Sequence, residues 1–187
     1  MRYCKTAALF FAILFLAGTL QGCSVLPKQE KNCEEVFTTY YAENSEAIHA
    51  CMNELRRNFS NTKTLYRFIP RGGNSIQVKQ FLSDGAITES HCSDLKCTQQ
   101  IFDSGVITGI DIRHGQISFH CNYAGLSRGI VHISSGNPEE IYGYNAAMVY
   151  QPKGNGWFGR LVDQENTDNT FYYSLIGDNW FYFEICS

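Results

Sequence analysis

The sequence predicts an α+β domain in which an N-terminal helix or helical hairpin packs on a curved antiparallel β-meander that bears disulfides. Three observations support this fold class: a helical apolar stripe in residues 33–58, short alternating runs after residue 60, and six cysteines beyond Cys23. We expect residues 32–187 to form a single α+β domain, because their number is that of one ordinary domain.

The helix is predicted from Asn32 to about Asn58. Asn32 is a good N-cap residue, and the acidic Glu34 and Glu35 favour the positive end of the helix dipole. Residues 44–45 interrupt the apolar stripe, so they either face solvent in one helix or begin the second helix of a hairpin. The stripe recurs mostly at three- and four-residue spacing and comprises Phe37, Tyr40, Tyr41, Ile48, Cys51, Leu55 and Phe59.

Nine short runs with strand character follow the helix. Tight turns at His114–Gly115, at residues 152–156 and at Gly177–Asp178 favour antiparallel neighbours, because parallel strands need long crossovers. Residues 89–105 are predicted to be an irregular excursion with one helical turn. The predicted strands cover residues 63–69, 75–82, 106–113, 116–123, 129–134, 145–151, 157–163, 170–176 and 179–186.

The cysteines of an exported domain are candidates for up to three disulfides, and the sequence alone does not select among their many pairings. Cys92 and Cys97 are the favoured pair because they are close in sequence. Cys33 and Cys51 would lie about 27 Å apart in one straight helix, so they could pair only in a helical hairpin. The candidates are Cys33, Cys51, Cys92, Cys97, Cys121 and Cys186.

The N-terminus has the layout of a secretory signal. Arg2 and Lys5 precede an apolar run over residues 6–18, which is shorter than the ~20 residues of a stable membrane-spanning helix. We therefore predict a signal peptide over residues 1–22 rather than a permanent transmembrane anchor.

The end of this apolar segment resembles the lipobox of bacterial lipoprotein precursors, through Leu20, Gln21, Gly22 and Cys23. The resemblance implies that the Cys23 thiol receives a diacylglyceryl group, that cleavage makes Cys23 the first residue, and that its amine is acylated. Ser24 would then direct the protein to the outer membrane, with residues 23–31 as a lipidated N-terminus and tether. The alternative is an ordinary signal peptide cleaved near Gly18 or Gly22.

The charge balance restricts the partners. Residues 1–22 include two basic residues and no acidic one, so their removal changes the formal charge from −3 to −5. Nucleic acid is not an expected partner, because phosphate binding needs clustered Lys and Arg. The expected partners are the membrane, through the lipid anchor, and an envelope protein or cell-wall component.

Motifs for catalysis are weak. Residues 125–129 match the G-x-S-x-G pattern around Ser127, but that motif requires a strand-to-helix turn and a histidine far downstream, whereas a strand follows here and His132 is close. His120 and Cys121 suggest a cysteine nucleophile with a histidine base, but adjacent residues of a strand point to opposite faces, so the two side chains would not meet. Glu139 and Glu140 fit a solvated turn. We expect no catalytic residue and no cofactor.

The segment over residues 91–97 could hold either a zinc site or a disulfide. His91, Cys92, Asp94 and Cys97 include the ligand types that zinc prefers, but no second ligand pair has similar spacing elsewhere. The disulfide is favoured for an oxidising compartment, and no metal is expected.

Aromatic residues are concentrated near the C-terminus. Trp180, Tyr182 and Tyr172 form a candidate binding platform for a protein or glycan, and the alternative is a last strand covered on both faces. The predicted function is a non-enzymatic envelope lipoprotein acting as a periplasmic binding module. The alternatives are an inhibitor or immunity protein against a cell-wall hydrolase or toxin, and a small periplasmic enzyme.

Overall fold

The computed structural model describes residues 33–61, 64–123, 126–137, 148–153, 156–161 and 170–186. The predicted signal peptide, the lipid site at Cys23 and the tether lie outside these residues. So do Glu139 and Glu140. Within the described chain, no helix is both long enough and apolar enough to cross a membrane.

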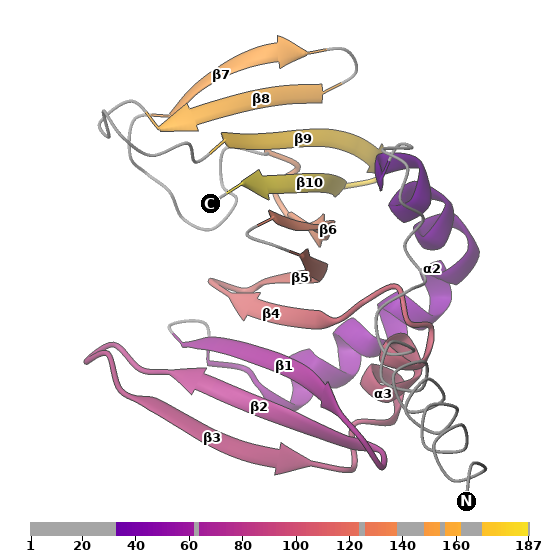
Figure 1. The fold of residues 1–187 in the computed structure, drawn as a ribbon, viewed down its shortest axis with the longest axis vertical. Helices are drawn as coiled ribbons and strands as arrows, with labels where there is room; N and C mark the ends of the chain where they lie inside the picture. The colour runs from indigo at the N-terminus through magenta and orange to yellow at the C-terminus, as the bar shows by residue number, and fades with distance from the viewer. Residues whose placement is uncertain are drawn as a thin grey trace, which may run out of the picture. The chain divides into compact units, whose positions relative to one another are not determined.

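The main element is one sheet of ten antiparallel strands, in the spatial order β3-β2-β1-β4-β5-β6-β10-β9-β8-β7 (Figure 1). A helix and an antiparallel sheet confirm the α+β prediction at this level. The strands are β1 (Leu65–Arg71), β2 (Ser75–Phe81), β3 (Ile87–Cys92), β4 (Gly109–Arg113), β5 (Gln116–Tyr123), β6 (Leu126–His132), β7 (Met148–Lys153), β8 (Gly156–Leu161), β9 (Thr170–Gly177) and β10 (Trp180–Cys186).

The chain departs from a simple meander at two places. After β3 reaches one edge of the sheet, helix α3 (Lys96–Asp103) precedes β4, which pairs with β1. After β6, the chain reaches β7 at the opposite edge and returns through β8 and β9 to β10, which pairs with β6. The tight turns therefore predicted the hairpins correctly, while the long-range neighbours of β4 and β10 come from the two longer connections.

Helix α2 (Cys33–Asn58) is a single element with a kink, not a hairpin. At Asn44 the backbone leaves helical geometry, with φ −122° and ψ 16°, and the Asn44 side chain donates a hydrogen bond to the Tyr40 carbonyl at 2.9 Å. That bond gives the side-chain amide a local partner at the kink. The chain continues in helical conformation after the kink, so the interruption of the apolar stripe does not begin a hairpin.

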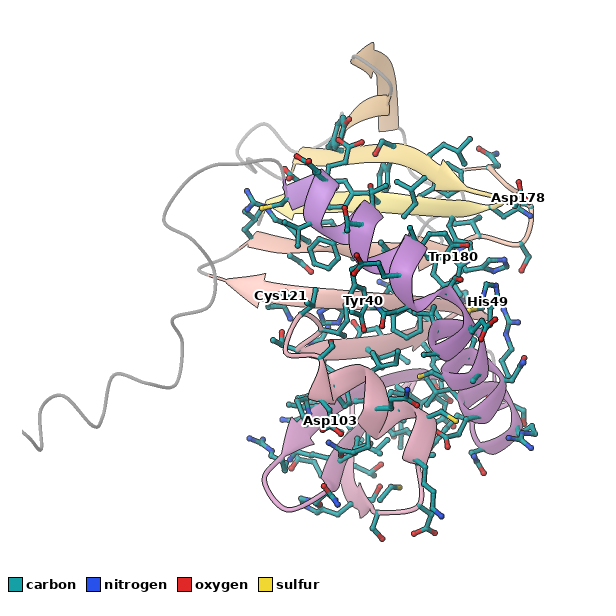
Figure 2. The ribbon with its side chains drawn as sticks, turned by 90° about the vertical axis from the view of Figure 1, so that its right-hand side faces the viewer. Tyr40, His49, Asp103, Cys121, Asp178 and Trp180 are labelled. Carbon is teal, nitrogen blue, oxygen red and sulfur yellow. The ribbon has the colours of Figure 1, made fainter. Side chains whose placement is uncertain are left out.

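The core lies between α2 and one face of the sheet. Figure 2 views the molecule from the α2 side, with Tyr40 and Trp180 where the helix crosses the strands. Each large apolar side chain that is fully buried contributes roughly 1.5–3 kcal/mol. Buried members of this core include Phe37, Ile48 and Leu55 from α2, and Phe68, Ile110, Phe119, Ile130, Trp180 and Tyr182 from the sheet.

The opposite face of the sheet, here called the far face, is also buried near its centre. Phe181 and Phe183 alternate with Trp180 and Tyr182 along β10, and all four side chains are buried. Because neighbouring residues of a strand point to opposite faces, β10 is covered on both sides. This confirms the alternative in which the last strand is covered on both faces.

Helix α3 receives its N-terminal cap from α2. Its N-cap residue, Leu95, has no side-chain group that could accept a hydrogen bond. The buried Glu54 carboxylate instead accepts from the backbone N–H groups of Cys97 at 3.1 Å and Thr98 at 2.8 Å, and from the Thr98 hydroxyl at 2.8 Å. A carboxylate is favoured at this position because free N–H groups and the helix dipole are both positive there.

Replacing Glu54 with glutamine should lower the free energy of unfolding by about 2 kcal/mol, because the charge is lost and an amide NH₂ group faces N–H donors in a buried site. Chemical denaturation at neutral pH measures this effect. The exposed Glu46 of the same helix provides the control, and Glu46→Gln should change the free energy by less than ~0.5 kcal/mol. Equal effects of the two substitutions would contradict the capping role.

Five of the six candidate disulfide cysteines lie in the described chain with described side chains, and all five are free thiols. Neither the expected Cys92–Cys97 bridge nor any other disulfide among these five cysteines is present in this structure. Cys97 is the second residue of α3, and its backbone N–H donates to Glu54 of α2. Cys92 is the last residue of β3.

Candidate functional site: the exposed edge strand

Strand β3 forms an accessible edge of the sheet. All of its residues from Ile87 to His91 are exposed, and Ile87 keeps 55% of its surface in contact with solvent. Among the described strands, β3 pairs with β2 alone. One side of β3 therefore presents backbone N–H and C=O groups that an added strand could bind.

The turn between β2 and β3 is fixed by local chemistry. Gly85 has φ +85°, a conformation that favours glycine, and its N–H donates to the Leu82 carbonyl at 3.0 Å. The Asp84 carboxylate accepts from the Ala86 N–H at 2.9 Å. The Leu82 N–H donates to the Ala86 carbonyl at 2.9 Å, which closes the hairpin and sets the register of β3.

The two edges of the sheet differ in composition. Strand β7, at the other edge, contains Pro152, which has no N–H group, and Lys153. Proline and lysine are the residues with which proteins commonly prevent pairing at an edge. The sequence of β3, ITESHC, contains neither of them. The edge at β3 therefore lacks the protection that the β7 sequence carries.

Side chains on the far face hold β3 to β2. The Lys79 ammonium lies 2.9 Å from the Glu89 carboxylate, and the Gln77 side chain donates to Glu89 at 2.8 Å. The Arg71 guanidinium in turn donates to the Gln77 oxygen. The hydrogen bond from Lys79 is the main cause that lowers the pKa of Glu89. These contacts fix the side chains of the hairpin and leave the outer backbone of β3 exposed.

A second polar group continues this face inward to β4 and β5. Arg67 binds both oxygens of Asp111, at 2.9 and 2.8 Å, and His120 Nε2 lies 3.4 Å from Asp111 Oδ1. Burial opposes ionisation of Asp111, but the two hydrogen bonds from Arg67 and the proximity of the His120 ring outweigh it and lower the pKa of Asp111 to about 2. Asp111 is thus a paired carboxylate in the sheet rather than a free acid or base.

The side chains considered for catalysis or for zinc binding, His120, His91 and Ser127, do not come together. His120 is buried, its ring lies against Gly109 of β4, and neither ring nitrogen has an aligned hydrogen-bond partner among the described residues. His91 is exposed on β3, four strand spacings from β5, or about 19 Å. Ser127 belongs to β6, where the chain continues as a strand as predicted.

The predicted aromatic platform was wrong for two of its three residues. Trp180 and Tyr182 keep 1% and 0% of their surface exposed, because α2 covers them. Phe37 of α2 lies 5.8 Å from the Tyr182 ring, and Tyr41 lies 5.0 Å from the Trp180 ring, between ring centroids. Only Tyr172 is partly exposed. These rings stabilise the helix–sheet interface and cannot receive a ligand there.

Tyr172 itself takes part in a structural contact at the start of α2. Its hydroxyl donates to the Glu34 carboxylate at 3.1 Å, and the Ser174 hydroxyl donates to the other Glu34 oxygen. Nearby, Arg128 of β6 lies 3.4 Å from the carboxylate of Glu184 on β10. These polar contacts position the first turn of α2 over β9, β10 and β6.

Groups of three or more His, Cys, Asp or Glu side chains suited to hold a metal ion are not found in the part of the chain that the structure describes. The same residues do present an exposed strand edge, and this feature was missed by sequence reasoning. The Asp84-Gly85 dipeptide after the strand over residues 75–82 was an available hairpin signal. Strand β3 was not predicted because its polar sequence lacks an alternating apolar pattern.

Comparison with known proteins gives no relative: no protein-family model, no curated protein and no solved structure matches this chain.

Proposed function

We propose that the protein is a non-enzymatic bacterial envelope lipoprotein, anchored through Cys23 in the outer membrane, that binds a protein partner in the periplasm by adding a partner strand to β3. The observation that carries the proposal is the exposure of β3 from Ile87 to His91 at an edge of a ten-stranded sheet that carries neither proline nor lysine. The lipobox at the end of the signal segment supports the anchor.

The chemistry of the edge favours an extended peptide over a glycan. A strand edge offers alternating N–H donors and C=O acceptors along a line, and another extended backbone supplies the complementary groups at the spacing of a β-ladder. The hydroxyl groups of a sugar chain do not repeat at that spacing. We therefore commit to a protein segment as the occupant of β3, in preference to a cell-wall polymer.

The side chains of β3 would supply the selectivity. In an enlarged sheet, Ile87, Glu89 and His91 would contact the partner on the far face, and Thr88 and Ser90 would contact it on the other face. Glu89 is already held by Lys79, so it presents a fixed geometry to a partner. A partner strand with an apolar residue opposite Ile87 would cover the most exposed apolar side chain of the hairpin.

Site-specific photocrosslinking in the native host tests the proposal. A benzophenone amino acid at Thr88 on β3 should give a crosslinked product at least about tenfold stronger than the same group at the exposed Thr39 of α2, because only β3 would contact the partner strand. Adding Ser90→Lys to the Thr88 protein should remove the product, since a lysine at an edge disfavours strand addition. Thermal unfolding should show that Ser90→Lys remains folded.

The outcomes separate the alternatives. A product that contains a cell-wall hydrolase or a toxin would identify the partner of an inhibitor or immunity protein, and a product of doubled mass would identify a second copy. Equal products from Thr88 and Thr39, or none from either, would overturn strand addition. Cys23→Ala should move the protein from the membrane to the soluble fraction, and a variant that stays in the membrane would overturn the anchor.

A further inference from the structure

The cysteines of the domain fall into two groups at different places in the core. At the start of α2, Arg128 donates a hydrogen bond to Cys33 Sγ at 2.8 Å, and Arg128 is the register partner of Cys121 on β5. The backbone of Cys186 pairs with Leu126, two residues from Arg128 on the same strand. These three cysteines form the first group.

The second group lies where α2 meets α3 and the end of β3, and comprises Cys51, Cys92 and Cys97. The groups are well separated. Cys33 and Cys51 are 18 residues apart on α2, or about 27 Å at the helical rise. Cys92 on β3 and Cys121 on β5 are four strand spacings apart, or about 19 Å. A disulfide joins Cα atoms at most ~7 Å apart, so neither of these pairs can form.

Within the second group, the contacts bring Cys97 to Cys51. The Cys51 thiol donates to the Thr98 hydroxyl at 3.5 Å, and Thr98 follows Cys97 directly. Glu54, one turn after Cys51 on α2, binds the backbone N–H of Cys97 at 3.1 Å. Cys97 also lines a shallow surface groove with Asn53 and other residues of α2. The first turn of α3 is thus fixed against the segment of α2 that carries Cys51.

Cys92 is a less suitable partner for Cys97. It ends β3, and Asp94 and the helix start lie between the two cysteines. The contacts of Thr98 with Cys51 and of Cys97 with Glu54 join the start of α3 to α2, and neither contact involves Cys92.

We propose that Cys51 and Cys97 form a disulfide that ties α2 to α3 under oxidising conditions, while Cys92 remains a thiol. Because each group holds three cysteines, each can form at most one bridge, and one cysteine of each group stays unpaired. The oxidant is a disulfide, either a periplasmic thiol–disulfide oxidoreductase or oxidised glutathione. The inference is independent of strand addition at β3.

The chemistry proceeds in two exchanges. Cys97 is partly exposed, so its thiolate attacks the disulfide of the oxidant, forms a mixed disulfide and releases one thiolate. The Cys51 thiolate then attacks the Cys97 sulfur, and the second thiolate of the oxidant leaves. The two protein thiols lose two protons and two electrons, and the oxidant is reduced to two thiols. Burial raises the pKa of Cys51 to about 12, which makes the second exchange the slow one in the folded protein.

Peptide mapping of the mature protein after treatment with oxidised glutathione tests the pairing. Free thiols are alkylated, and the chain is cut with trypsin and a glutamyl endopeptidase, which cleave at Lys96 and at Glu43 and so separate all the cysteines in question. The expected result is a linked pair of peptides with Cys51 and Cys97, with Cys92 alkylated. On full reduction, the intact mass should rise by about 4 Da at most, at ~2 Da for each bridge.

Substitutions of the two partly exposed cysteines, Cys92 and Cys97, test the pairing without disturbing the core. Cys92→Ser should leave the linked pair intact, and Cys97→Ser should abolish it without a new link to Cys51. Because Cys51 is fully buried, its substitution is avoided. A Cys92–Cys97 link, a mass rise of about 6 Da, or complete alkylation of Cys51 after refolding with oxidised glutathione would each overturn the proposal.

Discussion

Replacing Gly129 with alanine is expected to lower the free energy of unfolding by at least ~3 kcal/mol or to prevent folding. Gly129 lies on β6 opposite His120 of β5, where the two backbones approach closely. A Cβ atom at Gly129 would overlap the Phe119 carbonyl oxygen and would lie 2.8 Å from the Cα atom of His120. Both are backbone atoms in the centre of the sheet, so the strands themselves would have to move apart.

Two other glycines provide a graded control for this substitution. At Gly72, in the turn between β1 and β2, no described atom lies within 4 Å of an added Cβ, so Gly72→Ala should change stability by less than ~0.5 kcal/mol. At Gly109, an added Cβ would lie 2.5 Å from His120 Cε1. A side chain can move more easily than a backbone, so Gly109→Ala should have an intermediate effect of roughly 1–3 kcal/mol.

Chemical denaturation of the three purified variants measures this series. The order Gly72, Gly109, Gly129 should hold for the loss of stability at neutral pH. If Gly129→Ala unfolds at the same denaturant concentration as Gly72→Ala, the close approach of β5 and β6 is wrong. If Gly129→Ala does not fold, Gly109→Ala still tests the position of the His120 ring.

The elements that the sequence predicted well are those with a local cause. Helix α2 follows from an apolar stripe at helical spacing, and the turn between β4 and β5 follows from His114 and Gly115, which adopt φ values of 51° and 78°. Strand β3 was missed for a physical reason. An exposed edge strand has no face to bury, so residues 87–92 carry no alternating apolar pattern.

The contacts of the candidate site depend on strand order, which periodicity does not determine. Arg67 and Asp111 are 44 residues apart in the chain and meet only because β1 pairs with β4. The error at Trp180 and Tyr182 has a related cause. Rings on both faces of a strand fit a platform and a doubly covered strand equally well, and only the position of α2 decides between them.

The Arg67–Asp111–His120 group should make the stability depend on pH in the acid range. Asp111 has a pKa of about 2 in the folded protein, below its ordinary value of 3.8. A depressed carboxyl pKa stabilises the fold above pH 3.8, and that contribution is lost as the pH falls toward 2. The shift corresponds to about 2 kcal/mol, at ~1.4 kcal/mol for each pKa unit.

Asp111→Asn isolates this contribution from the other carboxyl groups. At pH 7 the substitution should lower the free energy of unfolding by about 3 kcal/mol, because it leaves the Arg67 guanidinium and the buried His120 without their carboxylate. Arg67 is 39% exposed and can turn toward water, which keeps the loss near the lower end for a buried pair. Asp103→Asn, on the exposed end of α3, should change stability by less than ~0.5 kcal/mol at pH 7.

The difference between the native protein and Asp111→Asn should shrink as the pH falls. Protonation of Asp111 in the native protein removes the charge that the variant already lacks, so the difference should decrease by about 2 kcal/mol between pH 5 and pH 2. Urea denaturation at several pH values in this range measures it. A difference that stays constant would show that Asp111 is not held ionised by Arg67 and His120, and the Arg67–Asp111–His120 group would then have no role in the acid stability of the sheet.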